Sequence, residues 1–165
     1  MPSALIILFA CIESEYLSKD AVESWATMWV SKLPCPPVWL IDLLGANNQD
    51  QQIDILRERL IQSGLLLDQE YAEFLLGFYY LNFINEKISL NEFESLAVDV
   101  VDAYDLEGVD PELLNKLFKK PISIDKAKEV AELYFGRYRE KSEKGYFYLS
   151  SGDLEKKEAS FFAGL

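Results

Sequence analysis

Residues 18–33, SKDAVESWATMWVSKL, give the clearest indication of the fold class. Their hydrophobic side chains recur three and four residues apart, which places them on one face of a helix. They are Val22, Trp25, Ala26, Trp29, Val30 and Leu33. Ser18 precedes this stripe, at a position where a serine hydroxyl can cap a helix. Prolines at 34, 36 and 37 then end the helix, because proline lacks an amide N–H and disfavours helical backbone in the residue before it.

The same helical period extends over most of the chain. Further helices are predicted over the hydrophobic run 5–12 and over 38–44, 53–63, 71–84, 90–104, 111–118 and 123–138. Ser89 and Glu92 have the spacing of a capping box, and Asp110 precedes a proline suited to the first helical position. The pattern leaves the form of the aromatic segment 146–149 open. Because no repeat or linker divides the chain, we predict one all-α domain, residues 1–165, with about seven or eight helices in a bundle.

Aromatic side chains concentrate at two places in the sequence. Three tryptophans flank the proline corner and are predicted to anchor the core: Trp25, Trp29 and Trp39. Residues 71–83 hold six aromatic side chains, and a helix that is apolar on most faces is expected to be central. Tyr79 and Tyr80 point in different directions on that helix, so one of the two is predicted to reach the surface, where tyrosine suits an interface.

The composition excludes several classes of function. The 165 residues include 28 acidic and 16 basic side chains, which gives a formal net charge of −12. We therefore expect no nucleic-acid partner, since such binding depends on cations that neutralise phosphates. Histidine is absent, so the chain cannot form a Ser-His-Asp triad, a Cys-His pair or an HExxH zinc site.

Two cysteines, Cys11 and Cys35, are too few for a disulfide scaffold and lack the spacing of a redox or metal motif. The hydrophobic run 5–12 is too short to span a bilayer, and no lysine or arginine precedes it as in a signal peptide. We predict a cytoplasmic protein with no membrane partner, whose first helix is buried.

The acidic residues are distributed unevenly. Residues 1–115 contain 5 basic and 20 acidic side chains, and no basic residue lies between Lys87 and Lys116. Carboxylates within that window lie opposite the apolar stripe of the predicted helix 90–104 or follow it in sequence. Such a face is either simply solvated or steers a cationic partner, and we favour partner binding because no lysine relieves the repulsion. The predicted partner-binding residues are Glu92, Glu94, Asp99, Asp102, Asp105, Glu107, Asp110 and Glu112.

A metal site is an alternative use of some of these carboxylates. Glu70 and Glu73, followed by Asp99 and Asp102, resemble the paired acidic motifs of all-α nucleoside-triphosphate pyrophosphatases. In those enzymes, carboxylates one helical turn apart hold Mg²⁺ against a triphosphate. Pairs with this spacing are common in so acidic a chain, and no set of basic residues for the phosphates is evident nearby. We therefore predict no metal, cofactor or catalytic residue, while a metal at these four carboxylates stays open.

The segment from Tyr16 to Leu43 resembles small immunity proteins of bacterial polymorphic and contact-dependent toxin systems. The resemblance is carried by Tyr16-Leu17-Ser18, by Val22-Glu23-Ser24-Trp25-Ala26 and by Pro36-Pro37-Val38-Trp39-Leu40-Ile41-Asp42-Leu43. A tryptophan-alanine helix is followed by a proline break and a second helix that begins with tryptophan. The resemblance implies a cytoplasmic protein that binds and neutralises a cognate toxin domain, often a basic nuclease. It transfers no binding residue, because interfaces vary among members of such families.

Three functions are compatible with these features. The first is an immunity protein, without enzymatic activity, that binds a cationic toxin domain through its acidic surface. The second is a helical adaptor or regulatory domain that binds another protein. The third is a Mg²⁺-dependent pyrophosphatase. We favour the immunity protein, because a partial motif and the distribution of charge both agree with it.

Overall fold

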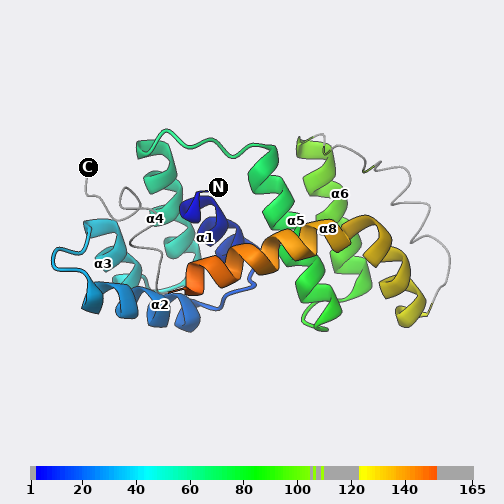
Figure 1. The fold of residues 1–165 in the computed structure, drawn as a ribbon, viewed down its shortest axis with the longest axis horizontal. Helices are drawn as coiled ribbons and strands as arrows, with labels where there is room; N and C mark the ends of the chain where they lie inside the picture. Colours follow the sequence, from blue (N-terminus) through cyan, green and yellow to red (C-terminus); the bar gives the residue numbers. More distant parts are fainter. Residues whose placement is uncertain (1–2, 105, 107–108, 110–122, 152–165) are drawn as a thin grey trace. The chain divides into compact units, whose positions relative to one another are not determined.

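The computed structural model describes residues 3–104, 106, 109 and 123–151 (Figure 1). These residues form seven helices and no strand, so the predicted all-α class is confirmed. The helices are α1 (Ala4–Glu13), α2 (Lys19–Lys32), α3 (Val38–Gly45), α4 (Gln49–Gln62), α5 (Gln69–Ile84), α6 (Leu90–Tyr104) and α8 (Ile124–Ser150). In the described part of the chain, no helix is long and apolar enough to cross a membrane.

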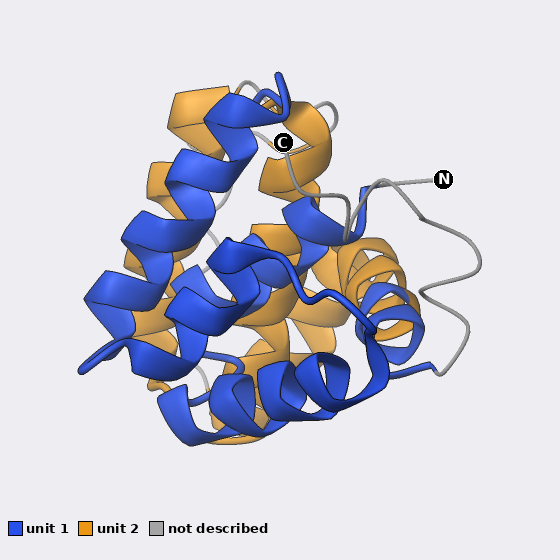
Figure 2. Cartoon of the chain, turned by 90° about the vertical axis from the view of Figure 1, so that its left-hand side faces the viewer, with its two compact units in different colours: residues 1–66, 145–165 blue, residues 67–144 orange. Residues whose placement is uncertain are grey.

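The chain divides into two compact units, coloured separately in Figure 2. Unit 1 comprises residues 1–66 and 145–165, and unit 2 comprises residues 67–144. Helix α8 therefore begins in unit 2 and ends in unit 1. That the whole chain acts as one domain stays a prediction.

The core of unit 1 is built on α1, in which every residue from Ala4 to Ile12 is buried. A helix that is apolar on all faces is stable in water only when it is covered, and α1 packs against α4. The Ser3 hydroxyl caps its first turn by accepting from the Leu5 amide at 3.3 Å. Gln49 donates from Nε2 to the carbonyl of Ile12 at 2.7 Å near its end. The predicted buried first helix is confirmed.

The proline corner connects α2 to α3, which pack against each other. Ser18 caps α2, as predicted, by accepting a hydrogen bond from the Ala21 amide at 3.3 Å. Trp29 and Trp39 are buried and confirm the predicted core anchors. Trp25 is only half-buried, and its ring donates from Nε1 to the carbonyl of Leu149 at 3.1 Å.

Helix α5 is the centre of unit 2, as its apolar composition predicts, and α6 packs along it. Phe93 of α6 is fully buried among three aromatic rings of α5 and α8. Ring centroids lie 5.1 Å from Phe83 in a stacked arrangement, 5.2 Å from Phe135 and 5.6 Å from Tyr80. Tyr80 is therefore core, and Tyr79 is the half-buried member of that pair.

A polar network closes one side of this aromatic cluster. Tyr80 donates its hydroxyl to Glu132 at 2.8 Å, and Arg139 donates from Nη2 to the other oxygen of that carboxylate, also at 2.8 Å. The bond from Arg139 is the main cause that lowers the pKa of Glu132, while burial is the main cause that raises the pKa of Tyr80. The network thus holds Glu132 charged and Tyr80 neutral.

We expect Glu132→Gln to lower the free energy of unfolding at about pH 7 by roughly 1 kcal/mol or less, since the carboxylate is partly exposed. Because the pKa of Glu132 is lowered, its charged form stabilises the native state, and this stability is fully present at pH values above the ordinary pKa of 4.5. The stability is lost as the pH falls through the lowered pKa. Urea denaturation at about pH 7 and pH 3 should show a difference that shrinks in acid. An equal difference at both pH values would contradict this assignment, and the exposed Glu129→Gln serves as the matched control on α8.

Two helices depart from their predicted bounds. Helix α4 begins at Gln49, earlier than predicted, because Asn48 accepts from the Gln51 amide at 2.9 Å and caps it. Helix α8 is 27 residues long and continues through the aromatic segment 146–149. Tyr146 packs edge-on against Tyr16, with ring centroids 5.4 Å apart, which holds the last turns in unit 1. The predicted helix 111–118 lies outside the described residues.

Candidate functional site

Helix α6 carries the described part of the predicted acidic surface. Its start is fixed by the predicted capping box, which the structure confirms. The Ser89 amide donates to the Glu92 carboxylate at 2.7 Å, and the Glu92 amide donates to the Ser89 hydroxyl at 3.3 Å. These two bonds satisfy amides that the helix itself leaves unpaired.

The two faces of α6 differ as the sequence predicts. Its inner face is buried through Phe93, Ala97, Val100 and Val101. On its outer face Glu92, Asp99 and Asp102 are exposed, whereas Glu94 is half-buried at the edge between the faces. The structure therefore brings Asp99 and Asp102 together on one exposed face, one helical turn apart.

The electrostatic surroundings of these two aspartates differ from those of several other acids in unit 2. Several carboxylates there have a lysine or arginine within ion-pair distance: Glu73, Glu86, Glu129, Glu132 and Glu143. No described lysine or arginine forms an ion pair with Asp99 or Asp102. Within the described residues, both carboxylates are thus exposed to solvent without an ion-pair partner.

Glu92 has a structural role as well as an exposed position. The hydrogen bonds from the Ser89 amide and hydroxyl lower the pKa of its carboxyl group, so it remains charged while it caps the helix. One of its oxygens is therefore already engaged. The other four predicted residues, Asp105, Glu107, Asp110 and Glu112, lie outside the described residues.

Two of the four carboxylates considered for a metal, Glu70 and Glu73, have a lysine partner. Lys141 of α8 donates to Glu73 at 2.5 Å and lies 3.9 Å from Glu70. Its ammonium group also lies 4.7 Å from the centre of the Phe74 ring. Among the described residues, no group of three or more acids and cysteines is placed to hold a metal ion.

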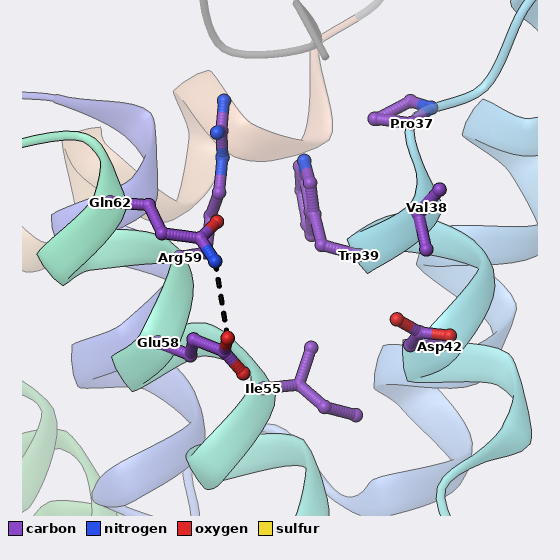
Figure 3. Close-up of a pocket in the computed structure, with 8 residues that line it drawn as sticks. All are labelled: Pro37, Val38, Trp39, Asp42, Ile55, Glu58, Arg59 and Gln62. Atoms are coloured by element: carbon purple, nitrogen blue, oxygen red, sulfur yellow. Dashed lines mark hydrogen bonds between the residues drawn. The ribbon is translucent and has the colours of Figure 1, made fainter. Parts of the chain in front are cut away.

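A hollow of about 580 Å³ lies between α3 and α4 in unit 1 (Figure 3). It is lined by Pro37, Val38, Trp39, Asp42, Ile55, Glu58, Arg59 and Gln62. A second, more open hollow of about 490 Å³ shares Asp42 and Ile55 with the first and extends to Gly45 and Ala46. The sequence pattern did not point to this region, although α3 (VWLIDLLG) is apolar apart from one charged residue, Asp42.

In comparisons with protein-family models, with curated proteins and with solved structures, no match to this chain was found. The resemblance to immunity proteins therefore stays an expectation, and function is inferred from the surfaces described above.

Proposed function

We propose that this chain is a cytoplasmic immunity protein that binds the cationic surface of a cognate bacterial toxin domain and neutralises it. The observation that carries the proposal is the exposed pair Asp99 and Asp102 on α6, which have no ion-pair partner among the described residues. The net charge of −12 and the absence of basic residues between Lys87 and Lys116 extend the same negative field. Neutralisation would require no chemistry of its own, only coverage of the toxin's active site or substrate groove.

The charge distribution suits rapid capture of a positively charged protein. A face of one sign raises the association rate by long-range attraction and disfavours acidic partners. The attraction acts over about 10 Å at 0.1 M salt and is screened as the ionic strength rises. Added salt should therefore lower the association rate constant more than it changes the dissociation rate constant.

The proposal is tested first by recovery of the partner. Tagged protein is used to capture partners from its host at about 50 and 300 mM salt, and the bound protein is identified by mass spectrometry. A basic toxin domain, released at the higher salt and harmless to cells only when co-expressed with this chain, is the expected result. An acidic or neutral partner, or a toxin that still kills on co-expression, would contradict the proposal.

We expect Asp99→Lys combined with Asp102→Lys to lower affinity for the captured toxin domain by about tenfold or more at low salt, through a slower association rate. The matched control reverses two exposed acids of α8, Asp125→Lys with Glu140→Lys, and changes the net charge equally. Surface plasmon resonance at both salt concentrations measures the effect. An equal loss in the two variants would show that only net charge matters and would reject α6 as the binding face.

A further inference from the structure

The two hollows of unit 1 share two lining residues, Asp42 and Ile55, and have both apolar and charged side chains in their linings. We call them together the α3–α4 groove and define it by Val38, Ile41, Asp42, Ile55 and Glu58. Val38 and Ile41 are 72% and 48% exposed, although large apolar side chains are usually covered in a folded protein. In Figure 3, Ile55 points from α4 toward α3, opposite Val38 and Asp42. The groove thus presents apolar contacts from both helices around one central carboxylate.

Two carboxylates lie beside the apolar side chains of the groove. Asp42 is exposed, lines both hollows and has no lysine or arginine partner among the described residues. Glu58 is exposed, lines the larger hollow and accepts a hydrogen bond from the Gln62 amide group at 3.1 Å (Figure 3). By contrast, Asp54 at the far end is paired with Arg57 at 2.9 Å. Asp42 and Glu58 are therefore the two acids left for an incoming cation.

The hollow also contains a buried cation. Arg59 is only 6% exposed, and its guanidinium extends beside the Trp39 ring, away from Ile55 and Asp42 (Figure 3). The lining of the larger hollow therefore includes two carboxylates, Asp42 and Glu58, and one guanidinium that is turned away from Asp42.

We propose that the α3–α4 groove is a docking site for a short cationic amphipathic segment of a partner protein. Apolar side chains of the segment would cover Val38, Ile41 and Ile55, while a lysine or arginine beside them pairs with Asp42 or Glu58. Helix α3 has eight residues and a length of about 12 Å, so the groove holds about two turns of a helix. The groove belongs to unit 1 and α6 to unit 2, so this site does not depend on the function proposed for α6.

Charge complementarity selects this occupant over a second copy of the chain. In a symmetric dimer built on the groove, the same acidic rim would face itself, and like charges would oppose each other across the interface. A cationic segment instead compensates the rim and covers the apolar floor at the same time.

The probe is a fluorescein-labelled peptide of about 14 residues, with leucines at i, i+3, i+4 and i+7 and lysines between them. Binding to the full chain is followed by fluorescence anisotropy at about 50 mM salt. Saturable binding is expected, and a peptide of the same composition with scrambled order, which has no apolar face, should bind about tenfold more weakly. No binding of the amphipathic peptide, or equal binding of the scrambled one, would overturn the proposal.

Matched charge variants separate the groove from the overall acidity of the chain. Asp42→Asn with Glu58→Gln removes two charges at the rim, and Asp125→Asn with Glu140→Gln removes two charges from exposed positions on α8. We expect about tenfold weaker peptide binding for the rim pair and less than about twofold for the α8 pair. Equal effects would show non-specific attraction and overturn the groove as the site, without bearing on a toxin bound at α6.

Matched apolar variants test the floor without any change of charge. Val38→Ser with Ile41→Ser is compared with Ile61→Ser and Leu66→Ser, which are 72% and 76% exposed and do not line either hollow. The groove pair should weaken binding about tenfold and the control pair by less than about twofold, with unchanged circular dichroism. Equal losses would overturn the proposal. So would a dimer in sedimentation equilibrium that the groove pair abolishes, because a second copy would then be the occupant.

Discussion

Replacement of Phe93 by alanine is expected to lower the free energy of unfolding by about 4 kcal/mol. The ring is fully buried and contacts three aromatic rings from two other helices. Its removal loses the transfer free energy of the ring and leaves a cavity that stiff aromatic neighbours cannot fill by collapse. The loss should be largest in unit 2, because Phe83, Tyr80 and Phe135 all belong to it.

Hydrogen exchange measured by mass spectrometry locates this effect. Peptides from α5 and α6 should lose protection, while peptides from α1 and α4 keep most of theirs. Phe147→Ala is the matched control, since that phenylalanine is 77% exposed on α8 and its removal should cost less than about 0.5 kcal/mol. Similar losses in the two variants would contradict the aromatic cluster as the core of unit 2.

The sequence predicted most helices because local signals and periodicity agreed. In α2 the Ser18 cap, the apolar stripe and the proline corner all specify the same bounds. In α6 the capping box and the stripe from Phe93 to Val101 specify both the start of the helix and its buried face. Agreement of this kind depends only on residues within a few turns, so no knowledge of the remaining chain is needed.

The end of α8 depends on residues far away in sequence. Gly145 interrupts the apolar stripe, so the local pattern leaves the form of the segment 146–149 open. In the structure, Tyr146 packs on Tyr16 and the carbonyl of Leu149 accepts from Trp25. These contacts join residues more than 120 positions apart, and they stabilise turns that propensity alone does not predict.

The candidate surfaces also combine features that the local sequence predicts with features that depend on distant residues. The exposure of Asp99 and Asp102 follows from the period of a single helix and was predicted. The neutralisation of Glu73 by Lys141 joins residues 68 positions apart, and the α3–α4 groove requires the relative placement of two helices. Sequence pattern therefore indicates which face of a helix is polar, but not which cation or neighbouring helix that face meets.

Gly77→Ala is expected to destabilise the chain by about 3 kcal/mol, although alanine is the better helix former. Helices α5 and α8 cross in Figure 1, and Gly77 of α5 lies close to Tyr138 and Ser142 of α8. The Ser142 hydroxyl donates to the carbonyl of Phe74 at 3.0 Å. A methyl group on Gly77 would overlap the Ser142 hydroxyl and the backbone carbonyl of Tyr138. The backbone carbonyl cannot rotate away as a side chain could, so the two helices must separate and weaken the packing around them.

Two further variants isolate that cause, each measured by urea denaturation. Gly45→Ala makes the same chemical change at the end of α3, where a methyl group meets no atom within 4 Å, and it should change stability by about 0.5 kcal/mol or less. Adding Ser142→Ala to Gly77→Ala should recover less than half of the loss, because the overlap with the Tyr138 carbonyl remains. Full recovery of stability in the double variant would show that the clash is with the Ser142 side chain alone. No loss of stability in Gly77→Ala would contradict the close approach of the two helices. The glycine thus matters through the space it leaves for α8, whereas its backbone is ordinary helix.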